Sequence, residues 1–308
     1  MQKYLSKKIK TTYKYSRKVV VDILYLISTI LPDYIFLKLI FRLKMGYKLD
    51  LDNPQTFSEK LQWLKLYNRK PEYTTMVDKA AVKEYVAKII GKEHIIPTLG
   101  VWDRFEDIDF DSLPNQFVLK TTHGGGNTGV VICKDKSSFD MASAKAKLNK
   151  SLRSCIYRRY KEWPYKDVKH RIIAEEYINT AKSDLTDYKF FCFGGEVKYC
   201  QVIQNRSTNL TIDFYDMHWQ HQPFVGLIAL GQHIEQSTTA VNKPQNYGLM
   251  LDIASKLSAN IPFARIDLFN TNGRIYFGEI TFYPASGLGA FTPSEWNDRL
   301  GEWIKLPD

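Results

Sequence analysis

The stretch FVLKTTHGGGNTGVVI, Phe117–Ile132, decides the fold. Its glycines, from Gly124 to Gly129, fit the spacing G-x-G-x-x-G, which several kinds of nucleotide-binding turn share. A dinucleotide-binding turn needs a helix after the glycines, and a Walker phosphate loop needs Lys followed by Ser or Thr. Here VVI follows at residues 130–132, and β-branched residues at the start of an apolar run predict a strand. Both turn types are therefore excluded.

The remaining form is a glycine hairpin between two strands. A protein kinase shares this form, but it places its lysine on the following strand and requires H-R-D and D-F-G elements, which this sequence lacks. Here the lysine is Lys120, on the strand before the glycines. Glycine lets backbone N–H groups approach phosphate oxygens closely, and Lys120 adds a positive charge. The hairpin is either a phosphate cover of this kind or a plain tight turn.

The composition is that of a folded protein with a substantial core. Of 308 residues, 44% are hydrophobic and 14% are aromatic, which predicts one large domain or two closely packed ones. The four cysteines show no C-x-x-C spacing, so we expect reduced thiols in packed positions. No segment reaches the roughly 18 uninterrupted apolar residues of a membrane span, and the chain after Leu31 lacks a signal-peptide cleavage pattern. We therefore expect a cytoplasmic protein.

The net charge of +10 is concentrated at the beginning of the chain. The first 48 residues carry eleven Lys and Arg but only two acids, Asp22 and Asp33, and they include the apolar run Val19–Leu31. A segment of this kind suits the inner face of an anionic bilayer better than a nucleic-acid groove, so we expect no nucleic-acid partner. Peripheral contact with the membrane and packing of a helix on the protein body remain as two alternatives.

Helical and β-rich segments alternate along the chain and predict an α+β fold. Helices are expected over residues 56–68, 74–91, 141–163, 246–260 and 294–304, the second one running through Asp78 and Lys79 without a break. Strands are expected within residues 94–102, 115–120, 130–134, 171–178, 188–193, 196–203, 210–215, 264–269 and 273–283.

A second group of polar residues lies in the last strand pair, residues 263–284. Arg265 and Asp267 are two apart on the first strand, and Glu279 and Thr281 are two apart on the next. Because side chains alternate along a strand, each pair shares one face of the sheet.

The turn between these strands decides whether the two faces coincide. A two-residue turn at 272–273 would send Asp267 and Glu279 to opposite sides of the sheet. A three-residue loop over 271–273 would place Arg265 opposite Glu279, with Asp267 diagonal to it, and we expect this loop. Two carboxylates with an arginine suit Mg²⁺ and phosphate, because Mg²⁺ takes one or two carboxylates together with substrate phosphates. The alternative is an exposed cross-strand ion pair.

The order of motifs along the chain resembles the ATP-grasp superfamily. These motifs are Asp78-Lys79, Val118–Gly129, Ile173–Ile178, Asp187–Phe190, and R-x-D followed by E-x-T at residues 265–281. Two more motifs, N-P-x-T-F-x-E-K-x-x-W-x-K from Asn53 and E-I-T-F-Y-P-A-S-G from Glu279, resemble the TupA-like branch. That branch is associated with bacterial cell-surface polysaccharide and teichuronopeptide synthesis. The resemblance runs from about Asp52 to the C-terminus.

The resemblance implies an ATP-grasp fold, in which two α+β subdomains clamp ATP. We expect a basic helical segment at residues 1–50 and a helical and linker region at 51–112. A glycine-loop subdomain is expected at 113–178, and a metal-binding subdomain at 179–308. The implied cofactors are ATP and Mg²⁺.

The resemblance also implies roles for individual residues. For ATP it implies Lys79 and Lys120 at the phosphates, Gly124, Gly125, Gly126 and Gly129 in a mobile cover, Glu175 with the backbone of Glu176, Tyr177 and Ile178 at the adenine, and Asp187 at the ribose. For Mg²⁺ it implies Asp267, Glu279 and Thr281, the last standing where many ATP-grasp enzymes have Asn. Lys189 and Arg265 are expected at the transferred phosphoryl group or the acyl substrate.

An ATP-grasp site implies ligation of a carboxylate to an amine through an acyl phosphate. The expected substrates are an amino acid and a uronic acid or amino sugar of a cell-surface polysaccharide, on a lipid-linked or nucleotide-linked precursor. Such phosphoryl transfer depends on positioning and charge neutralisation more than on a protein nucleophile.

Other patterns raise rival hypotheses. Asp107 and Asp109 have the D-x-D spacing with which some glycosyltransferases hold a metal and a sugar nucleotide, although a solvated acidic loop fits their polar context better. A glycosyltransferase of the same pathway is therefore the alternative function. His123 is expected to be a local hydrogen-bond partner, and His218 and His221 lack a third zinc ligand.

Overall fold

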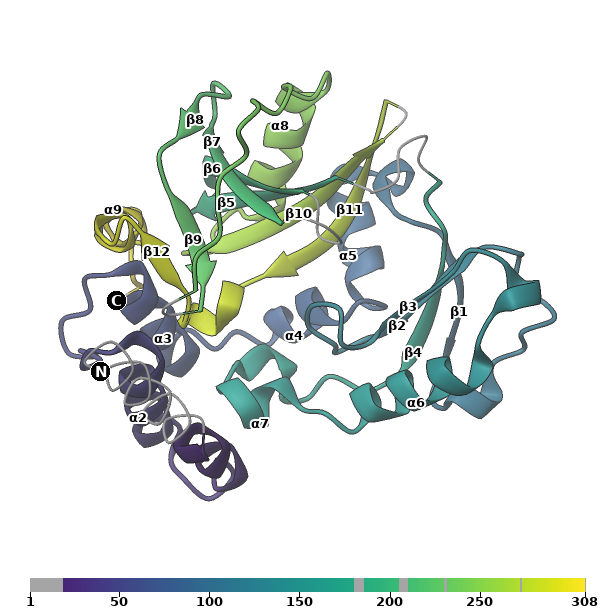
Figure 1. The fold of residues 1–308 in the computed structure, drawn as a ribbon, viewed down its shortest axis with the longest axis horizontal. Coiled ribbons are helices and arrows are strands. Elements are labelled where there is room, and N and C mark those ends of the chain that lie inside the picture. The colour runs from purple at the N-terminus through teal and green to yellow at the C-terminus, as the bar shows by residue number, and fades with distance from the viewer. Residues whose placement is uncertain (1–18, 180–185, 205–209, 230–231, 272, 308) are drawn as a thin grey trace, which may run out of the picture.

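The computed structural model describes residues 19–179, 186–204, 210–229, 232–271 and 273–307. Its main parts are two antiparallel sheets with helices packed around them, as predicted (Figure 1). A four-stranded sheet lies to one side of a six-stranded sheet (Figure 1). The candidate site lies where the two sheets face each other.

The four-stranded sheet carries the glycine hairpin. Its strand order is β1 (Thr98–Trp102), β4 (Ile172–Glu176), β2 (Phe117–Thr121) and β3 (Val130–Cys133). Helix α6 (Met141–Leu152) packs on β2 and β3 and closes a small apolar core around Phe117, Leu119 and Leu148. The hairpin between β2 and β3 is therefore attached to a rigid base, as the sequence predicts.

The six-stranded sheet carries the polar residues of the last strand pair. Its strand order is β11 (Arg274–Thr281), β10 (Ala264–Thr271), β5 (Asp187–Phe193), β6 (Glu196–Gln204), β7 (Thr211–Asp216) and β8 (His221–Gln222). Helix α8 (Tyr247–Leu257) covers one face of β5, β6 and β10. Strands β9 (Val225–Ile228) and β12 (Ala290–Thr292) pair separately and lead to helix α9 (Glu295–Trp303).

Helix α3 (Phe57–Tyr67) begins where the sequence predicts. Thr56 accepts a hydrogen bond from the backbone N–H of Glu59, and the Glu59 carboxylate accepts one from the Thr56 N–H, which forms a capping box. Phe57 and Leu61 are fully buried on the face that α3 turns to α9 and the large sheet.

The predicted helix over residues 74–91 is wrong in one respect, because it breaks at Asp78. Helix α4 (Glu72–Val77) ends there and α5 (Val82–Ile90) begins four residues later. The Asp78 carboxylate accepts a hydrogen bond from the Ala80 N–H (2.8 Å) and pairs with Arg171 (3.0 Å). This capping competes with helical hydrogen bonding. The break turns Lys79 toward the glycine hairpin.

The predicted helix over residues 141–163 is also interrupted. It ends at Leu152, and a short helix α7 (Ile156–Tyr160) and a single turn η4 (Trp163–Tyr165) follow. Ser154 bonds the Ser151 carbonyl through both its N–H (2.9 Å) and its hydroxyl (2.7 Å), which closes the last turn.

The N-terminal segment packs on the protein body with one of its faces. Residues 19–26 and α2 (Asp33–Met45) form a separate apolar cluster that includes Val21, Phe36 and Phe41. Residues 1–18, with most of the basic charge of the segment, lie outside the described residues. Within the described part of the chain, no helix combines the length and the apolar character that crossing a membrane requires.

The predicted register of β10 and β11 is wrong, although the predicted shared face is present. Thr271 pairs with Arg274 next to the turn, which is the register of a two-residue turn. The register then shifts by one residue between Asp267 and Leu268, with Gly278 as the extra residue of a β-bulge. Asp267 therefore lies directly opposite Glu279.

We predict that Gly278→Val destabilises the protein. A β-carbon at Gly278 would lie 3.0 Å from the Asp267 carbonyl oxygen and 3.2 Å from the Phe269 ring, so a larger side chain would force the bulge open. We expect the free energy of unfolding to fall by about 1–3 kcal/mol, as measured by urea denaturation. The control is Gly248→Val in α8, whose β-carbon would meet nothing within 4 Å. Equal stability of the two variants would contradict the role of the bulge.

Candidate functional site

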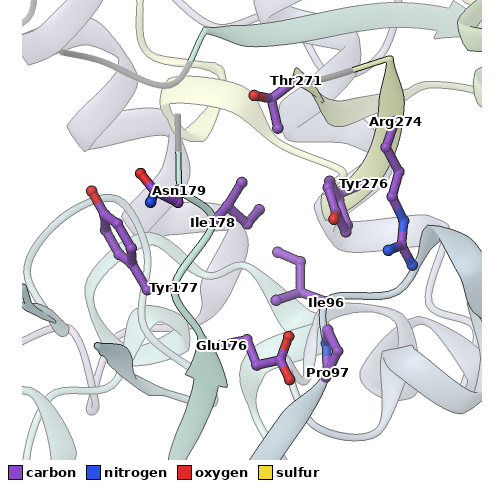
Figure 2. A pocket seen from close by; sticks show the side chains of 9 residues that line it. All are labelled: Ile96, Pro97, Glu176, Tyr177, Ile178, Asn179, Thr271, Arg274 and Tyr276. Atoms are coloured by element: carbon purple, nitrogen blue, oxygen red, sulfur yellow. The ribbon is translucent and has the colours of Figure 1, made fainter. Parts of the chain in front are cut away.

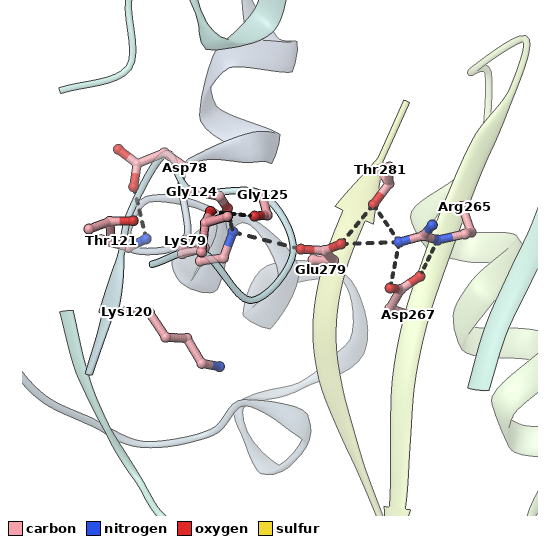
Figure 3. Close-up of polar contacts among 12 residues, drawn as sticks. Asp78, Lys79, Lys120, Thr121, Gly124, Gly125, Arg265, Asp267, Glu279 and Thr281 are labelled. Carbon is pink, nitrogen blue, oxygen red and sulfur yellow. Dashed lines mark hydrogen bonds and ion pairs between the residues drawn. The ribbon is translucent and has the colours of Figure 1, made fainter. Parts of the chain in front are cut away.

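The centre of the candidate site is a buried guanidinium between two carboxylates. Arg265 donates from Nε to Asp267 Oδ1 (2.7 Å) and from Nη2 to Asp267 Oδ2 (2.8 Å). The same Nη2 lies 3.1 Å from Glu279 Oε1 and 3.1 Å from the Thr281 hydroxyl (Figure 3). A bidentate pair of this kind fixes the orientation of both partners.

Strand β5 adds a lysine to this group. Lys189 lies opposite Asp267 in the sheet and pairs with its carboxylate. It also lies 2.7 Å from the carboxylate of Asp187, at the start of the same strand. Three positions predicted separately, Asp187, Lys189 and Asp267, are therefore in direct contact. Asp187 is predicted to lie at the ribose, and here it holds Lys189.

The neighbouring cations set the protonation of this group. Burial alone would raise the pKa of Glu279, but Lys79, Arg265 and Lys189 lower it to about 2. Burial raises the pKa of Asp267, and Arg265 and Lys189 oppose that change. Burial alone would lower the pKa of Arg265, but Asp267 and Glu279 raise it above its ordinary value. Glu279 is thus an anion at neutral pH.

Lys79 joins the glycine hairpin to the carboxylates. Its Nζ donates to the Gly124 carbonyl oxygen (2.5 Å) and lies 3.7 Å from Glu279 Oε2 (Figure 3). The hairpin and the carboxylate pair, which lie more than 130 residues apart in the sequence, therefore meet at one lysine. Lys79 can reach both partners because the helix is interrupted at Asp78.

Two of the hairpin glycines are required by close packing. A β-carbon at Gly124 would lie 2.3 Å from the Thr121 hydroxyl, and one at Gly129 would lie 2.1 Å from the same atom. Gly126 has φ +57°, the left-handed region that favours glycine. The Thr128 hydroxyl donates to the Gly125 carbonyl (2.9 Å) at the tip. The hairpin thus packs closely on Thr121 without side chains of its own at these two positions.

A second group of charges lines the cleft beneath the hairpin. Glu175 is 5% exposed, and it lies between Lys120 (2.5 Å) and Lys83 (2.6 Å). Burial alone would raise the pKa of Glu175, but the two lysines lower it. A pocket here is lined by Lys79, Lys83, Lys120, Glu175, Phe277 and Gly278, among others. Lys83 was not predicted, although it stands one helical turn after Lys79 and so on the same face.

A cavity of about 210 Å³ continues the cleft past the end of β4. Ile96, Ile178 and Tyr276 point into it, and Glu176 lies at its edge, whereas Tyr177 points away (Figure 2). Its walls combine apolar side chains, such as Ile96 and Ile178, with polar ones, such as Glu176 and Arg274, and this mixture suits a heteroaromatic ring that carries hydrogen-bonding groups.

The structure separates the residues predicted at the adenine. The Glu175 side chain lies with the lysines and does not line this cavity, whereas Glu176 to Ile178 do line it. The Glu176 N–H donates to the Pro97 carbonyl (3.1 Å), so a base at this position would depend on the other backbone groups of residues 176–178.

The loop after β11 contains a buried polar cluster that the sequence reading missed. Ala285 (φ 47°) and Ser286 (φ 57°) are both in the left-handed region, which is strained for residues other than glycine. The Ser286 hydroxyl donates to the Glu162 carboxylate, and Lys65 Nζ donates to the Ser286 carbonyl (2.8 Å). The signal was present, because Lys65 ends one of the two TupA-like motifs and Ser286 lies in the other.

The rival candidate residues have local partners. Asp107 pairs with Arg104 (2.6 Å), and Asp109 accepts the Asp111 N–H (3.1 Å), so the D-x-D run forms its own turn. His123 bonds the Ser151 carbonyl (3.1 Å), and His221 pairs with Asp213 (2.9 Å). The described residues contain no group of three or more His, Cys, Asp and Glu that could hold a metal ion.

A sequence model of the TupA-like ATP-grasp family matches residues 59–305. The chain belongs to the TupA-like ATP-grasp family. This assignment confirms the predicted resemblance and the predicted ATP-grasp fold. No curated protein matches the sequence at a significant level.

Several solved structures also resemble this chain. A D-alanine–D-alanine ligase from Bacillus anthracis is 17% identical, over 75% of this chain and 66% of the ligase, with a TM-score of 0.42. The D-alanine–D-alanine ligase of Helicobacter pylori is 13% identical over 82% of this chain and 70% of the ligase, with a TM-score of 0.44. A RimK domain ATP-grasp protein from Sphaerobacter thermophilus is 11% identical over 75% of this chain and 69% of that protein, with a TM-score of 0.38. This chain thus spans about two thirds of each of these proteins.

The residues of this ATP-grasp protein fit ATP and Mg²⁺. Mg²⁺ takes hard oxygen ligands, usually one or two carboxylates together with substrate phosphates. Asp267 and Glu279 offer two carboxylates on one face, and the Thr281 hydroxyl lies 3.0 Å from Glu279. Lys79, Lys83 and Lys120 line the adjoining pocket under the glycine hairpin, as a triphosphate requires.

We predict that Glu175→Gln lowers stability in a pH-dependent way. The variant leaves two partly buried lysines without their shared anion, so we expect a loss of about 3–5 kcal/mol at pH 7. The pKa of Glu175 is lower in the folded than in the unfolded chain, so its contribution is complete above the unfolded value of about 4.3 and is lost as the pH falls through the folded value. The stability gap between variant and wild type should therefore narrow toward pH 3.

Urea denaturation at pH 7, 5 and 3 measures this gap. The matched control is Glu176→Gln, the next residue, whose side chain is exposed and whose substitution should change stability by less than about 0.5 kcal/mol. Equal effects of the two substitutions at pH 7 would show that the lysines do not depend on Glu175.

Proposed function

We propose that this protein is an ATP-dependent carboxylate–amine ligase, which forms an amide through an acyl phosphate. One observation carries the proposal: Lys79 contacts both the glycine hairpin, at Gly124, and the carboxylate pair, at Glu279. A triphosphate between these two parts would lie against backbone N–H groups on one side and against metal-binding oxygens on the other. Membership of the TupA-like ATP-grasp family supports the same reaction class.

The proposed reaction has two steps. In the first, a carboxylate oxygen attacks the γ-phosphorus of ATP, the bond to ADP breaks, and an acyl phosphate forms. In the second, an amine attacks the acyl carbon, phosphate leaves with the bonding electron pair, and the amine loses a proton. Both steps place negative charge on oxygens, so positioned cations can lower both barriers.

The residues of the site divide these tasks. Lys79, Lys83 and Lys120 bind and orient the phosphates under the glycine hairpin. Arg265 and Lys189 neutralise charge on the transferred phosphoryl group and on the acyl oxygen. Asp267 and Glu279, with Thr281, would hold Mg²⁺, which when bound screens the charge between the phosphates.

We propose an amino acid and a uronic acid or amino sugar as the two substrates, in cell-surface polysaccharide biosynthesis. The association of the TupA-like branch with such polysaccharides supports this. The alternative, a glycosyltransferase of the same pathway, has less support because Asp107 and Asp109 are engaged in their own turn.

We propose further that the protein works in the cytoplasm at the inner face of the membrane. Half of the large hydrophobic side chains that are exposed in the described residues lie between residues 19 and 47. The most exposed are Leu26 (80%), Ile30 (78%) and Ile23 (50%). Ile23 and Leu26 lie on the helix of residues 19–26, on the side away from the buried Val21 and Leu24, and Ile30 lies in the turn that follows. An apolar ridge within a basic segment suits an anionic bilayer.

We predict that Asp267→Asn and Glu279→Gln each reduce ADP formation by about 100-fold or more. The assay contains ATP, Mg²⁺ and pairs of a uronic acid and an amino acid, and the wild-type enzyme should release ADP only when both substrates are present. Glu295→Gln, an exposed acid on α9, is the control and should retain full activity. Circular dichroism melting checks that each variant is folded.

The outcomes of this assay separate the candidate functions. Wild-type turnover in either metal-site variant would refute the assignment of Asp267 and Glu279. Release of UDP from a sugar nucleotide, without ADP, would identify a glycosyltransferase instead.

We predict that the triple variant Ile23→Ser, Leu26→Ser, Ile30→Ser loses membrane binding. Sedimentation with phosphatidylcholine vesicles containing phosphatidylglycerol should carry down the wild-type protein, and the variant should stay in the supernatant. Leu249→Ser on α8, where the leucine is 47% exposed, is the matched control and should sediment like wild type. Equal sedimentation of all three proteins would exclude the apolar ridge as the contact.

A further inference from the structure

Helix α7 (Ile156–Tyr160) connects the glycine hairpin to the N-terminal helices. At its start, Ile156 Cδ1 would lie 3.3 Å from a β-carbon on Gly125, at the tip of the hairpin. At its end, the Tyr160 ring packs edge-on against Tyr25, with 5.8 Å between the ring centroids. Figure 1 shows α7 between the hairpin and the N-terminal helices. Helix α7 thus contacts both the cover of the site and the helix that carries the apolar ridge.

The exposed charges of α7 have no acidic partner. Arg158 and Arg159 are exposed, and no carboxylate of the described residues forms an ion pair with either of them. Lys161, which follows α7, is different, because it is buried and pairs with Asp33 (3.1 Å). Most other cations around the site pair with carboxylates. The arginines of α7 are therefore a local excess of positive charge.

Arg159 is held in place by aromatic rings. Its guanidinium lies 4.9 Å from the centroid of the Tyr25 ring and 5.4 Å from that of Tyr160. A guanidinium carries five N–H donors, and phosphate oxygens match its geometry. Tyr25 belongs to the same helix as Ile23 and Leu26, so the arginine contacts the helix that carries the apolar ridge.

We propose that the arginines of α7 bind the diphosphate of a lipid-linked acceptor. This inference rests on the proposed ligase function and names the class of its acceptor. The lipid chain would lie along Ile23, Leu26 and Ile30, the diphosphate at Arg158 and Arg159, and the glycan would extend past the hairpin to the carboxylate site. A nucleotide-linked acceptor would have no use for an apolar ridge beside its phosphates, so the observations favour the lipid.

The ATP cleft does not account for these arginines. The lysines that line the pocket under the hairpin face the other side of Gly124, toward Glu279 and Glu175. The α7 residue that lies against the hairpin tip is Ile156, not an arginine. The two positively charged regions therefore serve different phosphate groups.

Farnesyl diphosphate is the probe, and its binding to the full chain is measured by isothermal titration calorimetry with the ATP cleft saturated by MgADP. We expect wild type to bind farnesyl diphosphate, inorganic pyrophosphate to compete with it, and farnesol to bind at least tenfold more weakly. The double variant Arg158→Gln, Arg159→Gln should weaken binding by roughly tenfold or more, because two charge-assisted hydrogen bonds are lost. The triple serine variant of the ridge should also weaken it.

The control is Arg299→Gln on α9, an exposed arginine that lies 4.9 Å from the Trp296 ring and so resembles Arg159 in its surroundings. Its affinity for farnesyl diphosphate should equal that of wild type. Unchanged binding in the double variant would overturn the proposal. So would arginine-dependent binding of UDP-glucuronic acid in place of farnesyl diphosphate. MgADP binding is measured first for every variant, so that a failure of the acceptor proposal can be told from a failure of the proposed ligase function. Failure of wild type to bind MgADP would contradict the ligase function itself.

Discussion

The buried guanidinium of Arg265 is the interaction on which the site depends. It holds Asp267 and Glu279 on one face of β10 and β11, where two carboxylates alone would repel each other. The β-bulge at Gly278 brings them opposite each other, and the guanidinium makes that position tolerable in a buried setting. Removing one partner of such a group leaves an uncompensated buried charge, which typically costs about 3–5 kcal/mol.

The rest of the cleft repeats this balance of charge. Lys189 pairs with Asp187 and Asp267, and Lys79 lies between Glu279 and the hairpin. The other group, Lys83 and Lys120 around Glu175, is self-contained in the same way. A triphosphate with its metal would exchange partners within these groups rather than bury new charge. A site of this kind keeps its side chains in position before any substrate binds, which is the main requirement for phosphoryl transfer.

The region around helix α7 and the loop after β11 gathers features that ATP alone does not require. The strained turn at Ala285 and Ser286 forms hydrogen bonds with Lys65 and Glu162. These residues come from three distant parts of the chain. Helix α7 ends two residues before Glu162 and contacts the N-terminal helices through Tyr160. Both motifs that resemble the TupA-like branch end in this region, whereas the general ATP-grasp motifs lie on the nucleotide side.

The sequence by itself determined most strands, although not the short β8, β9 and β12, together with most helices, the glycine hairpin with its lysine, and the pairs of residues that share a strand face. These depend on local patterns, such as side-chain alternation, β-branching and the capping box at Thr56, and local patterns are readable from one chain. Only the tertiary structure decided the register of β10 and β11, the break at Asp78 and the partners of Glu175. Each of these depends on a contact between distant residues: the backbone of Asp267 against Gly278, Arg171 on the carboxylate of Asp78, and two lysines from different elements on Glu175. Spacing along the chain carries no information about such contacts, because they form only after the sheets and helices have packed.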